Sequence, residues 1–402
     1  MNAFLTRAKT RAVGAREAKT LPASSWLQLS TMANCEMYVN ASDCTVNPWS
    51  MKCFTVLGTE ARIGIAVLCG LLGTLCVFEN CLVLYLIFSS PGMRRKPSYI
   101  FISSLALADL LASIIFVRSF VNFHVFNETD SKELFLLKLG GVNMSFTASL
   151  SSLLLMALDR YISISRPSKY KLLVTRKRAW TALGVLWVTC MATAFLPLMG
   201  WNCCTLNSAC SQLFPFVDNY YLSTWICLVM VLLGCIVCAY ACVLWRAHQH
   251  VAYMGKQQVH VGKQNARMRM DIMLAKTLVT VLTVLVLCWL PVLVFMIYSV
   301  FVYLNYPLRE VFAFCSTLCL LNSMVNPIIY TLRSTELYSS LRMRSTELYS
   351  SLRMRSTELY SSLRMLLSQC RRQLRTSNDS PEAESVHGSS MIETICEDIH
   401  VR

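Results

Sequence analysis

Charged residues are scarce in this chain. Asp, Glu, Lys and Arg make up 15% of its 402 residues, whereas hydrophobic residues make up 55%. An average soluble domain carries roughly 25% charged residues, so the composition argues against a soluble globular protein. Each apolar run is longer than the ~20 residues with which a helix crosses about 30 Å of hydrocarbon. These long runs lie near residues 62–88, 98–123, 133–163, 179–200, 218–245, 271–301 and 308–332.

The apolar runs also lack the groups that several classes of membrane protein need. None of the six histidines lies in the middle of a run, and no nucleophile stands beside a base or a metal cluster there, which argues against a membrane enzyme. Repeated halves and helices broken at matching positions, which mark many transporters, are absent. The outer half of the third run has no carboxylate beyond Glu133, so a cationic amine would have no counter-ion. The seventh run has no lysine, which excludes a retinal Schiff base.

The length of the runs determines the expected fold. Only helices and closed barrels satisfy their backbone groups in lipid, and long runs without alternation are helices. We therefore predict an all-α membrane protein, a seven-transmembrane helix bundle plus a cytoplasmic interfacial helix, with no cofactor. The predicted parts are an extracellular tail at 1–61, the bundle at 62–332, the interfacial amphipathic helix at 333–367 and a disordered cytoplasmic tail at 368–402.

The distribution of Lys and Arg predicts the orientation. Basic residues cluster after the first, third and fifth runs, whereas residues 201–217 contain none and residues 302–310 contain only Arg309. Because basic loops remain in the cytoplasm, we expect a plasma-membrane protein with an extracellular N-terminus. The net charge of +15 follows from the same bias beside anionic inner-leaflet lipid, so it does not indicate nucleic-acid binding.

The N-terminal segment permits two interpretations. Its basic residues between Arg7 and Lys19 are typical of a transit peptide or a basic amphipathic arm, and no secretory hydrophobic segment precedes residue 62. We favour a disordered tail followed by a first helix that acts as a signal anchor. The sequons at Asn40 and Asn127 would then lie outside the cell, which predicts glycosylation at both.

Most of the 19 cysteines lie within the apolar runs, where a thiol acts as a small hydrophobic group. Only the outward-facing cysteines can form disulfides. With six of them, fifteen complete pairings are possible, so the residues alone leave the connectivity open. The six are Cys35, Cys44, Cys53, Cys203, Cys204 and Cys210.

An eleven-residue unit occurs three times without change, at 333–343, 344–354 and 355–365. Eleven residues make about three helical turns, so the pattern stays on one face of a helix. Leu337 and Leu341 cluster there with Tyr338, as in a helix that lies on the inner leaflet. Identity at every position exceeds what helical physics requires and indicates a recent tandem duplication or an error in the gene model. We assign a function to the first copy only.

Asp109 is a carboxylate in the middle of an apolar run. Such a group must be protonated, paired or bound to a cation. Together with polar residues of the third and seventh runs it predicts a sodium or proton site that biases the states of the protein; a structural hydrogen-bond hub is the alternative. Those polar residues are Ser149, Asn322, Ser323 and Asn326.

The run Asp159-Arg160-Tyr161 ends the third apolar segment at the inner face. Asp271 opens the sixth segment at a similar depth, so Arg160 can pair with either carboxylate. A charge pair that closes the cytoplasmic end and opens on activation is a two-state element suited to a switch. A snorkelling helix end is the alternative.

Prolines interrupt the sixth and seventh apolar runs. Pro291 and Pro327 each remove a backbone hydrogen bond and predict a kink. Trp289 lies two residues before Pro291, where contact with a ligand can become helix movement. Tyr330 follows Pro327 by one turn, and Tyr240 in the fifth run can face it. Packing alone is the alternative.

The outer halves of the runs are rich in aromatic residues. An apolar cavity with a few orienting polar groups suits a lipid-like ligand, and ordinary core packing is the alternative. The candidate wall residues are Phe116, Phe120, Phe123, Phe146, Phe214, Tyr221, Trp225, Trp289 and Phe312, with His124, Lys138 and Ser316 as polar groups.

Five of the apolar runs contain a distinct polar residue or motif. In their order along the chain, these five resemble the motifs of a rhodopsin-like G-protein-coupled receptor. They are Asn80, Asp109, Asp159-Arg160-Tyr161, Cys288-Trp289-Leu290-Pro291 and Asn326-Pro327-Ile328-Ile329-Tyr330. Longer stretches resemble the cannabinoid receptors over about residues 62–333, for example Ser119-Phe120-Val121-Asn122-Phe123-His124 and Leu196-Pro197-Leu198-Met199-Gly200-Trp201. Cys203-Cys204 is more similar to type 2, and Gly140-Gly141 to type 1; the balance favours type 2.

The resemblance implies a G-protein-coupled receptor for endocannabinoid lipids that signals through inhibitory G proteins to lower cAMP, with arrestin and a receptor kinase as partners. It implies that Phe146 and Trp289 form a stacked pair that separates on agonist binding. It also implies a Cys203–Cys210 disulfide with Cys204 left free. The implied pocket residues are Phe116, Phe120, Phe123, His124, Phe146, Phe214, Trp225, Trp289, Phe312 and Ser316.

Some positions depart from the family pattern. Arg118 places a charge in the outer part of the second run, and Asn143 replaces a smaller pocket residue. In the tail, Cys370 beside two arginines predicts palmitoylation, and Ser and Thr residues between 376 and 394 are candidate phosphosites for arrestin. A lysophospholipid-type lipid receptor is the nearest alternative and would need more positive charge at the outer pocket. A non-receptor membrane transporter is the more distant one.

Overall fold

The computed structural model describes Phe54 and residues 57–128, 130–206, 208–256, 261–302 and 304–378. Side chains are described in these ranges except at residues 250–279, 306, 333 and 369–378. The chain divides into two compact units, Met1–Leu337 and Tyr338–Arg402. The predictions for Asn40, Asp271 and Cys370 concern side chains outside the described residues.

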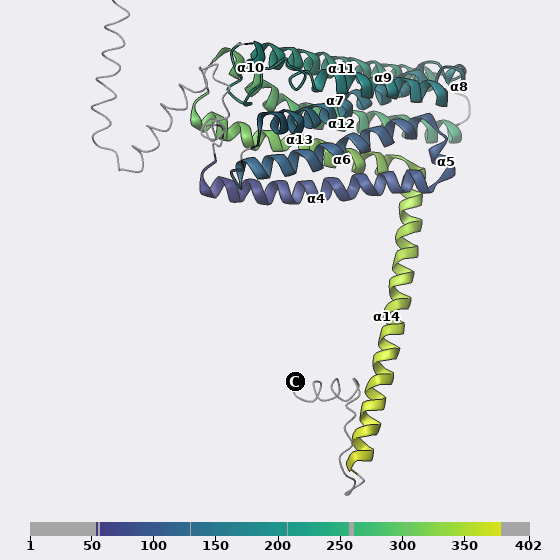
Figure 1. Ribbon diagram of the computed structural model, residues 1–402. Helices are drawn as coiled ribbons and strands as arrows, with labels where there is room; N and C mark the ends of the chain where they lie inside the picture. The colour runs from purple at the N-terminus through teal and green to yellow at the C-terminus, as the bar shows by residue number, and fades with distance from the viewer. Residues whose placement is uncertain are drawn as a thin grey trace, which may run out of the picture. The chain divides into compact units, whose positions relative to one another are not determined.

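Seven long helices in the described part of the first unit run side by side as a bundle (Figure 1). Their contacts close a ring in the order α4, α6, α7, α11, α12, α13 and back to α4, while α9 packs against α7 and α6. The predicted all-helical bundle is confirmed. The helices are α4 Thr59–Ser89, α6 Pro97–His124, α7 Lys132–Ser165, α9 Arg176–Ala194, α11 Asn219–Lys256, α12 Val261–Phe301 and α13 Tyr306–Arg333.

Within the described residues, six of these helices are long and apolar enough to cross a membrane. The seventh, α9, has 19 residues and begins with three basic ones, Arg176, Lys177 and Arg178. It ends at Ala194, and residues 195–200 form turns, so the predicted run over 179–200 is too long as a helix. Pro197 has no N–H to donate, and Gly200 takes a φ of 122° that favours glycine.

Short helices distinguish the two ends of the bundle. α5 Pro91–Arg94 and α8 Tyr170–Leu173 lie at one end, and α10 Cys203–Leu206 lies at the other (Figure 1). Because α5 and α8 belong to the basic loops, we refer to their end as the inner end. α10 belongs to the loop without basic residues, which marks the outer end.

α7 is the most enclosed of the membrane-spanning helices. Small residues allow neighbours to approach it closely. At Gly140, for example, an added Cβ would lie 2.6 Å from the ring of Phe195, well inside van der Waals contact. Asn80 on α4 is also fully buried, and its amide donates to the backbone oxygens of Cys76 and Ser323.

α14 Thr335–Asn378 contains nearly all of the repeated segment and is one continuous helix. Its first turn belongs to the first unit and is held at the inner end of α6. Lys96 forms an ion pair with Glu336, and the hydroxyls of Tyr99 and Ser334 are 2.7 Å apart. The ion pair holds the pKa of the Glu336 carboxyl below its ordinary value. Leu337 is fully buried there.

Candidate functional site

A large cavity opens between the outer halves of the helices. It contains about 1190 Å³ of space outside protein atoms, part of it open to the outside, and its wall is mainly apolar. Helices α6, α7, α11, α12 and α13 contribute side chains, and the second outer loop adds Phe214. The cavity includes every residue that the resemblance assigned to a pocket, namely Phe116, Phe120, Phe123, His124, Phe146, Phe214, Trp225, Trp289, Phe312 and Ser316.

The aromatic side chains of the wall form a connected series. Phe116 stacks on Phe120 with 4.9 Å between ring centroids, and its ring centroid lies 6.0 Å from that of Phe146. Phe146 in turn stands edge-on to Trp289, at 5.5 Å and 86°. Such pairs are worth about 1 kcal/mol beyond the area they bury. The floor of the cavity is therefore a specific contact between α7 and α12.

Three ring nitrogens at the cavity wall have no hydrogen-bond partner among the described residues. They are His124 Nδ1, Trp225 Nε1 and Trp289 Nε1, and all three atoms are buried. A buried polar atom without a partner costs roughly 1–3 kcal/mol. A ligand with a hydroxyl or carbonyl group can supply the missing bonds, so these atoms are candidate orienting contacts in a cavity that is otherwise apolar.

The structure places Tyr221 outside this wall. Its hydroxyl lies 3.3 Å from the backbone oxygens of Thr193 and Ala194, and its ring packs edge-on against Trp201. Tyr221 therefore connects α11 to the end of α9, and its prediction as a ligand contact does not match its position. Asn143 lines the cavity.

The cavity wall contains three charged residues, Asp130, Lys138 and Arg309. The Lys138 ammonium forms an ion pair with Asp130, at 2.6 and 2.8 Å, and both residues reach the cavity wall. Arg309 also lines the cavity, although it is only 7% exposed, and its Nε donates to the backbone oxygen of Leu304 at 3.2 Å. Arg118 is exposed and does not line the cavity.

A disulfide closes the second outer loop above the cavity. Cys203 and Cys210 are bonded to each other, which confirms the predicted pair. Cys204 is disulfide-bonded as well, so the expectation of a free thiol there is wrong.

Asp218 anchors the same loop to α11. It is fully buried and accepts hydrogen bonds from the backbone N–H groups of Tyr220 and Tyr221, from the Trp201 indole and from the Ser208 hydroxyl. These bonds cap the first turn of the helix. They also fix the loop that carries Phe214 into the cavity.

A buried polar hub lies deeper in the bundle, around Asp109. One carboxylate oxygen accepts from the hydroxyls of Ser149 at 2.7 Å and Ser323 at 2.9 Å. The other accepts from the amide of Asn326 at 3.0 Å. Asn322 is buried nearby in the sequence, but no hydrogen bond joins it to Asp109 in the described structure. Three helices, α6, α7 and α13, therefore meet at one carboxylate.

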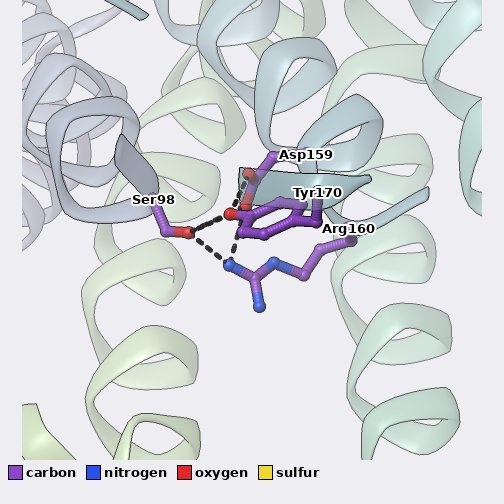
Figure 2. Close-up of polar contacts among 4 residues, drawn as sticks. All are labelled: Ser98, Asp159, Arg160 and Tyr170. Atoms are coloured by element: carbon purple, nitrogen blue, oxygen red, sulfur yellow. Dashed lines mark hydrogen bonds and ion pairs between the residues drawn. The ribbon is translucent and has the colours of Figure 1, made fainter. Parts of the chain in front are cut away.

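At the inner end, Asp159 is the centre of a second polar cluster, drawn in Figure 2. Its side chain is 2% exposed and accepts hydrogen bonds from the Tyr170 hydroxyl at 2.7 Å and the Ser98 hydroxyl at 2.9 Å. The Arg160 guanidinium lies 2.7 Å from the same carboxylate and donates to Ser98 at 2.6 Å. Burial raises the pKa of the Tyr170 phenol above its ordinary value.

The remaining predicted switch residues lie in the inner half of the bundle. Tyr240 is buried in the core, and Tyr161 and Tyr330 are partly buried against it. Pro291 and Pro327 lie inside the continuous helices α12 and α13. The predicted pairing of Arg160 with Asp271 concerns a side chain outside the described residues. Among the described ones, the arginine turns to its neighbour Asp159.

Comparison with known proteins identifies the family. Residues 79–330 match the profile of the 7 transmembrane receptor (rhodopsin family). Cannabinoid receptor 2 of Homo sapiens is 53% identical over 290 residues, which cover 72% of this chain and 80% of that receptor. Cannabinoid receptor 1 of Xenopus laevis is 51% identical over 308 residues, 73% of this chain and 65% of that receptor. The chain belongs to the cannabinoid receptor family.

Members of this family are receptors of the rhodopsin type, so the chain is a multi-pass membrane receptor and not an enzyme. The identities to types 2 and 1 differ by only two percentage points. They agree with the mixture of type 2 and type 1 features in the sequence.

Sequence reasoning missed several residues of this cannabinoid-family site. Ser98 and Tyr170 complete the Asp159 cluster, and Asp218 holds the outer loop. Arg309 offered a signal, since it lies three residues before Phe312 and so shares a helix face with it. Tyr170 offered little signal in the sequence, because its hydrogen bond to Asp159 depends on how a loop folds.

Proposed function

We propose that this chain is a plasma-membrane receptor for an endocannabinoid-like lipid and that it signals through inhibitory G proteins to lower cAMP. The observation that carries the proposal is the apolar cavity whose floor is the contact between Phe146 and Trp289. The names and similarity of the cannabinoid receptors support the ligand class. Endocannabinoid-like lipids have a long apolar chain and a small polar head, which suits this wall.

The ligand acts by binding one state more tightly than the other. Its chain lies among the aromatic residues, and its head group bonds to one of the buried nitrogens of His124, Trp225 and Trp289. An occupied cavity separates Phe146 from Trp289. Pro291 leaves one hydrogen bond of α12 unmade beside Trp289, so the inner half of α12 can swing outward.

Movement of α12 reaches the inner end, where the G protein binds. In the resting state Asp159, held by Ser98 and Tyr170, retains the Arg160 guanidinium. Outward motion opens the space beside α7, and Arg160 leaves Asp159 to face the G protein. Arrestin and a receptor kinase act later, on the Ser and Thr residues between 376 and 394.

The Asp109 hub regulates this equilibrium. Sodium prefers oxygen ligands, and the Asp109 carboxylate with the Ser149 and Ser323 hydroxyls provides three of them from three helices. A cation held there would tie α6, α7 and α13 together and favour the resting state.

Direct binding tests the ligand assignment. Purified full-length receptor should bind an endocannabinoid saturably, and the bound lipid should resist displacement by a lysophospholipid. Preferential binding of the lysophospholipid would replace this proposal with the second candidate. Buried Arg309 at the cavity wall is the observation that favours that candidate. The neutralisation of Lys138 by Asp130 counts against it.

A further inference from the structure

The three copies of the eleven-residue unit are identical in sequence but differ in environment. Leu337, in the first copy, is 0% exposed, whereas its equivalents Leu348 and Leu359 are 62% and 64% exposed. Tyr349 and Tyr360 are exposed too. The second and third copies thus repeat an apolar surface that the first copy uses for packing, and within the described part of the second unit they leave it uncovered.

The two leucines and the tyrosine of each copy form one continuous strip. At eleven residues per three turns, each residue advances by about 98°, so Leu348 and Leu352 lie about 33° apart and Tyr349 lies about 98° from Leu348. At the usual 100° per residue, the same positions recur in the third copy with a drift of only about 20°. The strip therefore runs nearly straight along both copies of α14.

Arginines border this strip on both sides. On the same projection, Arg344 lies about 33° before Leu348 and Arg353 lies about 131° after it. The acidic residue of the second copy, Glu347, lies beyond Arg344, which forms a 3.0 Å ion pair with it. An apolar strip with arginines at both edges fits a lipid surface, because the side chains can bury their stems while their charged heads reach phosphates.

We propose that the second and third copies, residues 344–365, form an arm that binds an anionic membrane surface through Leu348, Leu359 and the bordering arginines. The chain leaves the bundle directly at the inner end, since only Ser334 separates α13 from α14. The arm therefore starts beside the inner leaflet, whose anionic lipids complement its charge. Residues 344–365 contain four arginines and two glutamates. The repeat pattern alone assigns a function to the first copy only, whereas the exposed strip assigns one to the second and third copies as well.

Hydrogen exchange on the full-length receptor in nanodiscs tests the arm. We expect the amides of residues 344–365 to exchange about tenfold more slowly when phosphatidylserine is added to phosphatidylcholine discs, because a helix held on the surface opens less often. Equal exchange in the two kinds of disc would overturn the proposal. Nanodiscs expose both leaflets, so this result does not depend on the orientation assigned to the receptor.

A pair of matched variants identifies the face that binds. Leu348→Gln with Leu359→Gln removes two apolar residues from the strip, and this variant should lose the protection. Met354→Gln with Met365→Gln removes two exposed apolar residues from the opposite face, and this one should keep it. Glutamine is a good helix former, so neither pair lowers helix propensity much. Equal effects of the two pairs would contradict the proposal.

The number of receptors per disc distinguishes lipid from a second copy of the chain. Protection by lipid should be the same with one receptor per disc and with two. Protection that needs two receptors and no anionic lipid would show pairing between arms and would overturn the proposal. A cAMP assay on the leucine variant separates loss of membrane binding by the arm from loss of receptor function. Because the arm lies outside the ligand cavity, the variant should keep its response to the ligand.

Discussion

The ring of Phe146 on α7 stands edge-on to the indole of Trp289 on α12, with 5.5 Å between centroids and 86° between planes. Both rings line the apolar cavity, and Trp289 lies two residues before the proline of α12. A ligand in this cavity would therefore contact Trp289, the side chain beside the proline at which the inner half of α12 can move.

Truncation of either ring should change the balance between states. An aromatic pair contributes about 1 kcal/mol, which corresponds to about a fivefold change in their ratio. We expect Phe146→Ala to raise basal inhibition of cAMP by that factor. Trp289→Ala also removes the side chain through which the ligand moves α12, so it should reduce the maximal agonist response. Leu290→Ala, on the exposed face of the same helix, is the control. Full efficacy in Trp289→Ala would rule out the proposed switch.

The Asp109 hub predicts a specific response to sodium. In the native receptor, agonist affinity should fall as NaCl replaces KCl at constant ionic strength, which keeps general screening unchanged. Asp109→Asn retains the shape of the side chain but loses its charge, so its agonist affinity should not depend on which salt is present. Radioligand competition measures both. A sodium effect that survives in Asp109→Asn would remove the cation site from the account.

Tyr170 should restrain the inner switch. Tyr170→Phe removes one hydrogen bond to the Asp159 carboxylate, a loss of about 1 kcal/mol and about a fivefold gain in the open state. Nucleotide exchange on the G protein without agonist should rise accordingly. Lys171→Gln, its exposed neighbour on α8, should leave basal exchange unchanged. If Tyr170→Phe were as silent as the control, the phenol would have no part in the switch.

Asn143 should determine which lipid head groups bind well. Asn143 lies at the cavity wall. Asn143→Ala should weaken a ligand that bonds to the amide by about fivefold, since a hydrogen bond is worth about 1 kcal/mol. A ligand without a polar head should lose little. Arg118→Gln should alter neither affinity, and selectivity that follows Arg118 instead would show that the charge outside the wall selects the ligand.

The sequence was sufficient to predict the bundle because lipid imposes a length and a composition on each helix. Asp109 and its partners could be foreseen for the same reason, since a carboxylate at membrane depth needs polar neighbours. The end of α9 was misplaced because apolar composition continues into turns at residues 195–200. Hydrophobicity does not reveal where the backbone stops being helical.

The parts that sequence reasoning missed depend on rotation and on loops. Tyr221 lies among pocket residues in sequence, yet the rotation of α11 turns its hydroxyl toward the end of α9. Tyr170 reaches Asp159 only because the second inner loop folds into the short helix α8. Cys204 was expected to be free because the resemblance pairs Cys203 with Cys210 and gives Cys204 no partner.

Inhibition of cellular cAMP by the full-length chain is the most direct test of the central claim. Cells that express the receptor should be treated in parallel with an endocannabinoid and with a lysophospholipid, with and without pertussis toxin to block inhibitory G proteins. The account predicts a saturable, toxin-sensitive response to the endocannabinoid alone. Silence toward the endocannabinoid, with a response to the lysophospholipid, would contradict it.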